Sequence, residues 1–402
     1  MLSSKPSEAE ADWNRHKSQA NCQSQEIDEL MKLTGLESVK KQMVAIHRDA
    51  HIARMQNLDL SRRRFGTVFV GNPGTGKTTV GRLYGKFLAS VGIIPGYKFI
   101  ETTGSRLAIE GVEGCRASID NLLRDGGGVL FIDEAYQLIE GSGSLGKQVL
   151  EFLVAEVENL TGKMVFILAG YKKKMEKLLA HNQGLSERFP CRLNFEDFDD
   201  AELMQIMESW IRKTWGDKMV VEDGLGGLYC RIAARRIGRL RGQDGFANAR
   251  AVENVMARVC ERQSKRLSQS IAQGGDFDHF FLDKQDMLGP DPSLALRSSK
   301  AMQRLHDMTG LNAVKSTVQG LLNTVQYNYR RELNEQPLVE YSLNKVFLGN
   351  PGTGKTSVAK IYGQILVDIG LLSNGEGMQG MSDQVQQIDL VNKHDSCGQK
   401  SV

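Results

Sequence analysis

Residues 68–79 read Val-Phe-Val-Gly-Asn-Pro-Gly-Thr-Gly-Lys-Thr-Thr, and this stretch is the strongest indication of the fold. It places a short apolar run before a glycine-rich loop at 71–78, whose spacing is G-x-x-x-x-G-K-[ST], and a helical pattern after it. Glycines let the backbone curl so that successive N–H groups point at phosphate oxygens, where side chains would collide. The stretch therefore predicts a phosphate-binding loop between a strand and a helix.

The residue types in this loop indicate nucleotide chemistry. Lys77 offers a mobile cation for the β- and γ-phosphates, and Thr78 offers a hydroxyl to Mg²⁺. The helix that follows adds its N-terminal N–H groups and the positive end of its dipole. We expect ATP and Mg²⁺ as cofactors. The predicted binding residues are Gly71, Asn72, Pro73, Gly74, Thr75, Gly76, Lys77, Thr78 and Thr79.

A second apolar run, at 128–132, ends in two acids, Asp133 and Glu134. An open parallel sheet places its reactive groups at the carboxyl ends of its strands. Asp133 is therefore predicted to hold Mg²⁺ through water, and Glu134 to orient and deprotonate the attacking water. With Lys77, these two acids are the predicted catalytic residues of an ATP hydrolase.

The pattern along the chain predicts an α/β core followed by a helical domain. Apolar runs at 67–70, 97–101, 128–132, 164–169 and 192–195 alternate with helical segments at 77–91, 116–124 and 146–159. Such alternation implies a mainly parallel sheet covered on both faces. We expect a flexible leader over 1–27, an α/β nucleotide-binding core over 28–199, an α-helical lid over 200–270 and a linker over 271–299.

The loop recurs later in the chain, again behind a short apolar run. Its second copy consists of Gly349, Asn350, Pro351, Gly352, Thr353, Gly354, Lys355 and Thr356, and residues 308–315 likewise repeat 33–40. The repeat predicts a duplicated module with a second nucleotide-binding loop. After residue 372 the sequence turns polar, without an apolar run ending in Asp-Glu. We therefore expect a partial second module over 300–372 and a disordered tail over 373–402.

Together these elements resemble the AAA+ ATPases. The chain looks most similar to the group that contains the red-type rubisco activase CbbX and stage V sporulation protein K, over about residues 28–270. Besides the loop, the resemblance rests on residues 34–40, 131–136, 167–171, 184–189 and 246–250. It implies a P-loop NTPase fold with a parallel sheet and a small α-helical lid. Residues 300–372 then begin a second AAA+ module that the chain does not finish.

The resemblance also implies roles for two arginines. Arg188 would be an arginine finger that enters a neighbouring subunit's ATP site, where a guanidinium offsets charge developing on the γ-phosphate. Arg250 would be a second sensor that touches the same phosphate from the lid. A finger acting in trans implies a homo-oligomeric ring, a hexamer, and the resemblance implies that ATP hydrolysis is coupled to remodelling of a protein partner.

One stretch departs from the group that the chain resembles. Such ring ATPases carry an aromatic residue in a central pore loop, and the matching residues 109–114 contain none. Val112 offers little apolar area with which to grip an extended polypeptide. This departure argues against threading of the substrate protein, although remodelling without deep threading remains open.

Composition and the remaining motifs exclude several classes. A net charge of +3 over 402 residues does not predict a polyanion-binding surface, so a nucleic-acid partner is not expected. The six cysteines are scattered, the first thirty residues lack an apolar signal segment, and no run of 18 apolar residues occurs. We therefore expect an intracellular, cytoplasmic protein without a membrane span, with the nucleus left open.

Two histidines raise the question of a metal site. His47 and His51 lie four residues apart on a predicted helix, but no third ligand follows at a suitable spacing. The pair is therefore predicted to lie on a solvated helix face and to bind no metal. Two alternatives to the remodelling ATPase stay open. One is a nucleotide-switched assembly scaffold with little turnover, and the other is a nucleic-acid-associated AAA+ protein.

Overall fold

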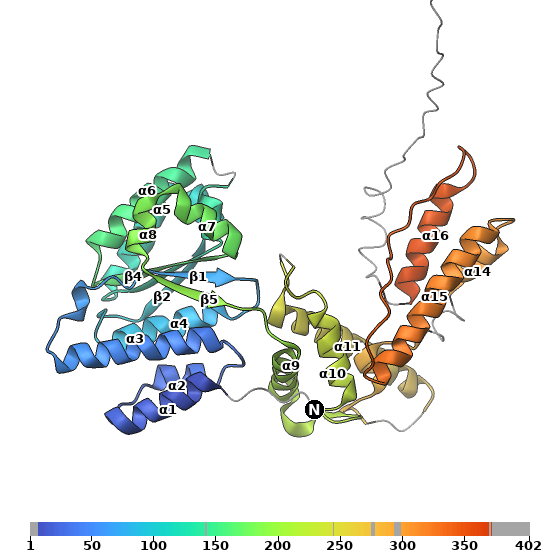
Figure 1. Ribbon diagram of the computed structural model, residues 1–402, viewed down its shortest axis with the longest axis horizontal. Coiled ribbons are helices and arrows are strands. Elements are labelled where there is room, and N and C mark those ends of the chain that lie inside the picture. Colours follow the sequence, from blue (N-terminus) through green and yellow to red (C-terminus); the bar gives the residue numbers. More distant parts are fainter. Residues whose placement is uncertain are drawn as a thin grey trace, which may run out of the picture. The chain divides into compact units, whose positions relative to one another are not determined.

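The computed structural model describes residues 7–140, 143–243, 245–274, 278–292, 299–369 and 371. The chain divides into two compact units (Figure 1). The first comprises Met1–Glu261 and Leu267–Leu282, and the second comprises Arg262–Arg266 and Asp283–Val402. Within the described ranges, no helix is both long enough and apolar enough to cross a membrane.

A five-stranded parallel sheet forms the centre of the first unit, in the order β2-β3-β4-β1-β5. Each predicted strand is present, with its ends within two residues of the predicted bounds, so the α/β fold is confirmed. All positions of the central β4 are buried, as expected for a parallel sheet covered on both faces. The strands are β1 (Thr67–Gly71), β2 (Lys98–Thr103), β3 (Gly128–Asp133), β4 (Met164–Gly170) and β5 (Cys191–Phe195).

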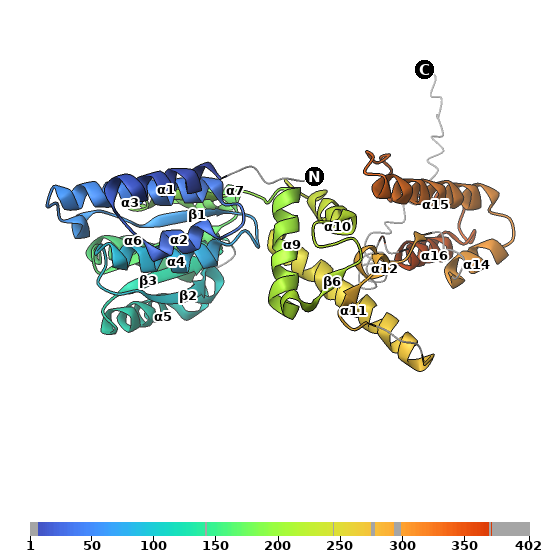
Figure 2. The same ribbon diagram turned by 90° about the horizontal axis from the view of Figure 1, so that it is seen from below.

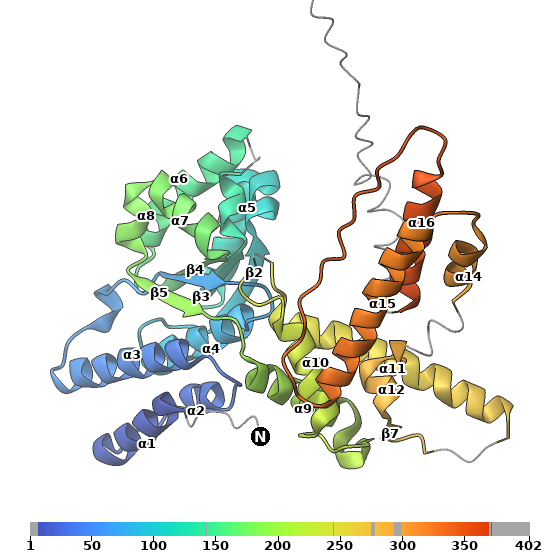
Figure 3. The ribbon, with the colours of Figure 1, turned by 45° about the vertical axis from the view of Figure 1, so that its right-hand side comes forward.

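Helices cover both faces of this sheet (Figure 3). Alternate strand residues such as Phe69 and Phe131 pack under α3 (Glu37–Met55) and α4 (Lys77–Ser90). Their neighbours, among them Val68 and Ile132, pack on the other face. That face is covered by α5 (Gly104–Arg124), α6 (Gly143–Asn159), α7 (Lys172–His181) and α8 (Gln183–Arg188). Short 3₁₀ turns connect these elements at η1 (Leu60–Arg62) and η2 (Ala135–Leu138).

The predicted flexible leader is wrong for residues 7–27, which are largely helical. They form α1 (Glu8–Ala20) and the start of α2 (Gln25–Met31), and these helices pack against α3 and α4. Trp13 is only 1% exposed, and its Nε1 donates a hydrogen bond to Asp28 Oδ1 at 2.7 Å. The segment has few apolar residues, but α1 buries Ala9, Trp13 and His16, which share one helix face. Concentration on that face provides the buried surface that the composition does not reveal.

The lid region also contains elements beyond its predicted helices. Helices α9 (Asp200–Trp215) and α10 (Leu228–Gly238) lie side by side (Figure 2), and α11 (Asn248–Ala272) follows them. The turn η3 (Gly216–Lys218) leads into β6 (Val220–Val221), which pairs with β7 (Phe281–Leu282). Strand β7 and helix α12 (Lys284–Leu288) lie in the predicted linker. Two-residue strands are too short to leave a periodic signal, which is why the prediction missed them.

The second unit has a small helical core. Its helices are α14 (Lys300–Asp307), α15 (Asn312–Leu333) and α16 (Lys355–Asp368), which bury Leu305, Leu322 and Ile365 among others. The strand expected before the second loop is not formed. Residues 336–350 have no regular structure, and Val346 and Leu348 are 76% and 72% exposed. A strand requires a pairing partner, and the described residues of this unit supply none. The predicted tail over 373–402 lies outside the described residues.

The repeat is visible in individual contacts. Lys40 donates to the carbonyl oxygens of Met31 and Leu33, and Lys315 donates in the same way to those of His306 and Met308. The residues before α3 and α15, Leu36 and Leu311, both adopt the left-handed conformation. The two halves therefore share local structure as well as sequence.

We predict that Trp13→Ala lowers the free energy of unfolding of the first unit by about 3–5 kcal/mol, because it leaves a cavity between α1 and α3. Urea titration followed by circular dichroism measures the change. Trp215→Ala, which removes a half-buried tryptophan of the lid, is the matched control and should cost less. An unchanged midpoint for Trp13→Ala would show that α1 is not docked on the core.

Candidate nucleotide-binding site

The phosphate-binding loop runs from the end of β1 to the start of α4 and has no room for side chains at two glycines. A Cβ atom on Gly71 would lie 2.4 Å from the carbonyl oxygen of Phe195 in β5. One on Gly74 would lie 2.2 Å from that of Ala247 in the lid, and Gly74 also has φ +69°. The loop is thus held in its curled form by β5 on one side and the lid on the other.

Lys77 lies inside this loop. Its Nζ donates hydrogen bonds to the carbonyl oxygens of Gly71 at 3.0 Å and Asn72 at 2.7 Å. The pKa of Lys77 is lowered to about 8, chiefly by burial; Asp133 and Glu134 oppose this shift, and the charge of Arg250 adds to it. The structure therefore brings together Lys77, both predicted carboxylates and Arg250, as nucleotide chemistry requires.

The two carboxylates end β3 as predicted. Asp133 Oδ1 accepts a hydrogen bond from the N–H of Glu134 at 2.9 Å. Glu134 has φ +49°, a left-handed conformation that side-chain-bearing residues seldom adopt and that is concentrated at functional sites. Gln137 Nε2 donates to Glu134 Oε2 at 2.6 Å, and its Oε1 accepts from the N–H of Ser105 in α5 at 3.1 Å. Gln137, which the sequence analysis missed, thus links Glu134 to α5.

A hydrogen-bond network connects the loop to the lid. Asn72 Nδ2 donates to both carboxylate oxygens of Asp197, at 2.9 and 3.0 Å. Asn248, fully buried at the start of α11, donates from Nδ2 to Asp197 Oδ1 at 2.8 Å and to the carbonyl oxygen of Pro73 at 3.3 Å. Asp197 and Asn248 are not among the site residues predicted from the sequence. Their positions were the only available signal: Asp197 lies two residues after β5, and Asn248 lies two residues before Arg250.

The remaining polar residues of the site lie at its edge. Thr78 Oγ1 donates to Glu101 Oε1 at 3.3 Å, and Arg82 pairs with the same glutamate at 2.9 Å. Thr79 is exposed on the first turn of α4. Thr75 is buried, and its hydroxyl donates to the carbonyl oxygen of Asn72 at 2.8 Å, which supports the turn of the loop.

Arg188 is not brought to the loop of its own chain. Its Nη2 pairs with Glu158 Oε2 at 3.0 Å, and its Nη1 donates to the carbonyl oxygen of Gly184 at 3.1 Å. The Nε atom is buried and has no hydrogen-bond partner among the described residues. Arg64 also pairs with Glu158. The guanidinium is therefore held in one place, at the end of α8, by a shared carboxylate.

The second loop reproduces the first without its surroundings. Lys355 donates to the carbonyl oxygens of Gly349 at 2.9 Å and Asn350 at 3.0 Å, and α16 begins after Gly354, which has φ +81°. Most of its residues are exposed, namely Gly349, Asn350, Pro351, Gly352, Thr353 and Thr356, whereas Gly354 and Lys355 are half-buried. In the described part of this unit, no strand ends in an Asp-Glu pair beside the loop.

The residues of the first loop fit a nucleotide with Mg²⁺. Helix α4 begins after Gly76, a residue without a side chain to cap it, so the first N–H groups of the helix can bind phosphate oxygens. Thr78 and Asp133 present the hard oxygen ligands that Mg²⁺ prefers. The cradle is closed to side chains at Gly71 and Gly74, as close backbone approach to phosphate requires.

Comparison with known proteins agrees with this geometry. Residues 67–197 match the model of the ATPase family associated with various cellular activities (AAA), and residues 199–294 match the AAA lid domain. The lid match extends beyond the lid expected over 200–270 and includes β7 and α12. The chain is thus covered from its first strand to the end of its lid by a core model and a lid model of one family.

Three curated relatives are similar over most of their length. Stage V sporulation protein K of Bacillus subtilis is 30% identical over 246 residues, which are 60% of this chain and 74% of that protein. Protein CfxQ of Xanthobacter flavus is 32% identical over 251 residues, 61% of this chain and 76% of that protein. A CfxQ homolog of Cyanidium caldarium is 32% identical over 272 residues, 66% of this chain and 93% of that protein.

We predict that nucleotide affinity falls as the pH rises above about 8. In the free site Lys77 loses its proton near that pH, whereas phosphate favours the charged ammonium, so binding above it requires proton uptake. The Kd for a fluorescent ADP should rise about tenfold between pH 8 and pH 9.5. A Lys355→Met background removes the second loop from the measurement. The Lys77→Met variant should bind ADP weakly, with a Kd that does not depend on pH. A Kd that does not depend on pH while Lys77 is intact would contradict the prediction.

We also predict that Asn248→Ala weakens ADP binding at least tenfold, about 1.4 kcal/mol, because the lid loses its hydrogen bonds to Pro73 and Asp197. Equilibrium titration with fluorescent ADP measures the loss. Asn159→Ala, an exposed asparagine at the end of α6, is the control and should bind as the unaltered chain does. Equal affinities for the two variants would show that this network does not support the loop.

Proposed function

Because the chain belongs to the AAA ATPase family, in the group of stage V sporulation protein K and the CfxQ (CbbX-like) proteins, we propose that it couples ATP hydrolysis in a ring of identical subunits to the remodelling of a protein partner. Nucleotide binding and ATP hydrolysis follow from the family, as the sequence analysis predicted. The ring, the individual residue roles, Mg²⁺ and the partner are the proposal. The main support for the ring is the position of Arg188. It pairs with Glu158, whereas the other predicted site residues gather around Lys77 of the same chain.

The residues of the first unit divide the chemistry between them. Lys77 and the first N–H groups of α4 would bind the phosphates, and Thr78 and Asp133 would hold Mg²⁺, which neutralises charge on the phosphate oxygens. Glu134, positioned by Gln137, would accept a proton from the attacking water. Arg250 adds a positive charge from the lid, near enough to Lys77 to lower its pKa.

Arg188 is proposed to act on the neighbouring subunit. Glu158 and the carbonyl oxygen of Gly184 hold its guanidinium away from the loop of the same chain, so a finger for that loop has to come from elsewhere. An arginine already held in place loses less side-chain entropy when it meets a phosphate than a free one would. A ring in which each subunit completes the next site meets this requirement, and the hexamer is the form that the resemblance implies.

The partner-facing region is proposed to be the break in α5. Gly111 has φ +68° and interrupts the helix, and Ile109 beside it is 82% exposed. Val112, by contrast, packs partly buried against the core, so it is not a gripping residue. An open cavity of about 560 Å³ lies between Ile109 and Gln137, the residue that holds Glu134. A partner bound at Ile109 is thereby connected to the catalytic glutamate through the start of α5.

The identity of the partner, an intracellular location and the absence of a nucleic-acid partner stay predictions. A measurement of ATP turnover distinguishes the remodelling ATPase from its rival, the nucleotide-switched scaffold. The scaffold requires ATP binding and assembly without turnover, whereas the remodelling ATPase requires turnover at shared interfaces.

We predict that Glu134→Gln binds ATP but loses at least about 100-fold in kcat, because no base accepts the proton. Arg188→Ala should lose about 10³-fold, because the γ-phosphate loses its trans cation. Phosphate release from ATP with Mg²⁺, measured across protein concentration, tests both. Arg64→Ala, which removes the other partner of Glu158, is the matched control and should keep most of the turnover.

Mixing the two inactive variants separates a trans role from a cis role. After subunit exchange, an Arg188→Ala subunit with an intact Glu134 can receive Arg188 from a Glu134→Gln neighbour, so part of the activity should return. If Arg188 acts within its own chain, no pairing restores a complete site and the mixture stays inactive. ATP binding without turnover in the unaltered chain, at every concentration, would instead favour the scaffold.

A further inference from the structure

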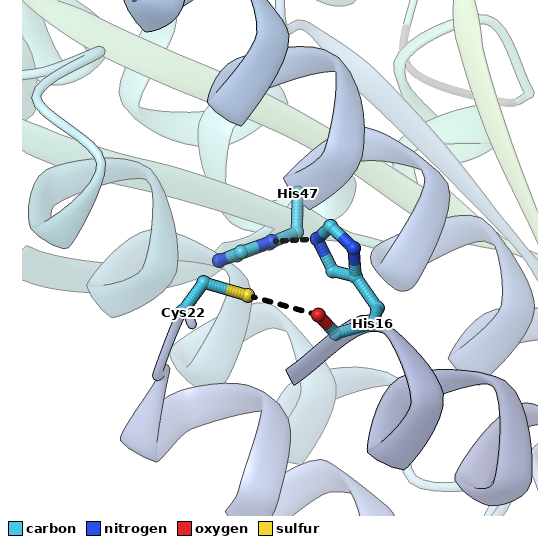
Figure 4. Close-up of side chains that lie close together, drawn as sticks. All are labelled: His16, Cys22 and His47. Carbon is cyan, nitrogen blue, oxygen red and sulfur yellow. Dashed lines mark hydrogen bonds between the residues drawn. The ribbon is translucent and has the colours of Figure 1, made fainter. Parts of the chain in front are cut away.

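Three side chains with metal-binding atoms meet where the N-terminal helices pack on α3 (Figure 4). His16 comes from α1, Cys22 from the connection between α1 and α2, and His47 from α3. Nε2 of His16 lies 3.2 Å from Nδ1 of His47, and the ligand atoms of all three residues lie within 4.8 Å of one another. Both histidines are buried and Cys22 is half-buried. The expectation of a solvated helix face is therefore wrong for His47.

This cluster could not be predicted from the sequence, because its members lie on different segments. His16 and Cys22 are six residues apart, and His47 follows on another helix after 24 further residues, a spacing that matches no metal-binding motif. Only the packing of α1 on α3 brings His16 and Cys22 close to His47. His51, the residue paired with His47 in the sequence, is outside the cluster, although its ring centroid lies 6.0 Å from that of His16.

Burial disfavours the charged form of both imidazoles. Burial lowers the pKa of His47 to about 4, and burial with the charge of Arg48 holds the pKa of His16 below its ordinary value. Neutral imidazole is the form that coordinates a metal. Two ring nitrogens that face each other at this distance share at most one proton, which makes one hydrogen bond between them.

The distances suit a tetrahedral zinc ion. Two nitrogens that are each about 2.0–2.1 Å from tetrahedral Zn²⁺ lie about 3.3 Å apart, close to the separation of the two histidine nitrogens. The thiolate sulfur would lie about 3.5 Å from each nitrogen, so Cys22 has to approach by roughly 1.3 Å at most. Cys22 lies in a short irregular connection and at present only donates to the carbonyl oxygen of His16 at 3.8 Å, so a small backbone shift suffices.

We propose that His16, Cys22 and His47 form a zinc-binding site, with water as the fourth ligand. Two imidazoles and one thiolate form a donor set that favours a borderline-soft divalent ion such as Zn²⁺. A bound ion would join α1 and the following connection to α3, in addition to the contacts of Trp13. It would thereby make the docking of the N-terminal helices on the AAA core dependent on zinc.

Cobalt titration of the full chain, freed of metal and nucleotide, tests the site. One equivalent of Co²⁺ should produce the visible bands of tetrahedral cobalt together with a thiolate-to-cobalt charge-transfer band, and Zn²⁺ should displace both. The nucleotide site contains no thiol among its described residues, so cobalt bound there does not give the charge-transfer band. Trp13, whose ring centroid lies 5.0 Å from that of His47, supplies a second signal through its fluorescence.

Cys22→Ser should abolish the charge-transfer band and weaken Zn²⁺ binding at least 100-fold. Its circular dichroism should stay unchanged, because serine is similar in size and Cys22 is only half-buried. Cys260→Ser, another half-buried cysteine, should leave both unchanged. His16→Gln should remove the tetrahedral cobalt bands, and if it does not fold, the serine variants decide alone. Absence of the charge-transfer band from the unaltered chain, or equal zinc affinities for the two serine variants, would overturn the proposal and leave a histidine pair that only packs.

Discussion

The close approach of three backbone segments around the phosphate-binding loop is the constraint on which the site depends. Gly71 touches the end of β5 and Gly74 touches the turn before α11, each with no space for a Cβ atom. Any side chain at either position would push the loop away from the sheet or from the lid. The glycines therefore do more than permit the curl of the loop, because they also allow the core and the lid to close on it.

Several properties of the site follow from this closeness. Lys77 is desolvated by the surrounding backbone, which lowers its pKa even though two carboxylates are near. Asn72, Asp197 and Asn248 complete a hydrogen-bonded path from the loop into the lid. Gln137 forms a second path, from Glu134 to the start of α5. Direct hydrogen bonds thus link the site both to the lid and to the start of α5.

The second loop shows what happens without those neighbours. Its lysine makes the same two backbone contacts as Lys77, so the local conformation depends only on the loop and the helix that follows. Most of its preceding residues, however, stay irregular and exposed, because the described part of that unit contains no sheet to receive them. Loop geometry alone therefore does not make a hydrolytic site.

The α/β fold, the five strands, the loop and the carboxylates that end β3 could be predicted from the sequence, because each depends on local periodicity or on residues close in the chain. The packing of α1 through Trp13, the ion pair of Arg188 with Glu158, and the hydrogen bonds among Asn72, Asp197 and Asn248 became visible only in the folded chain. Folding also brought His16 and Cys22 to His47. These contacts join residues far apart in the chain, and side chains at such separations leave no periodic signal, since their proximity is set by how helices pack on the sheet.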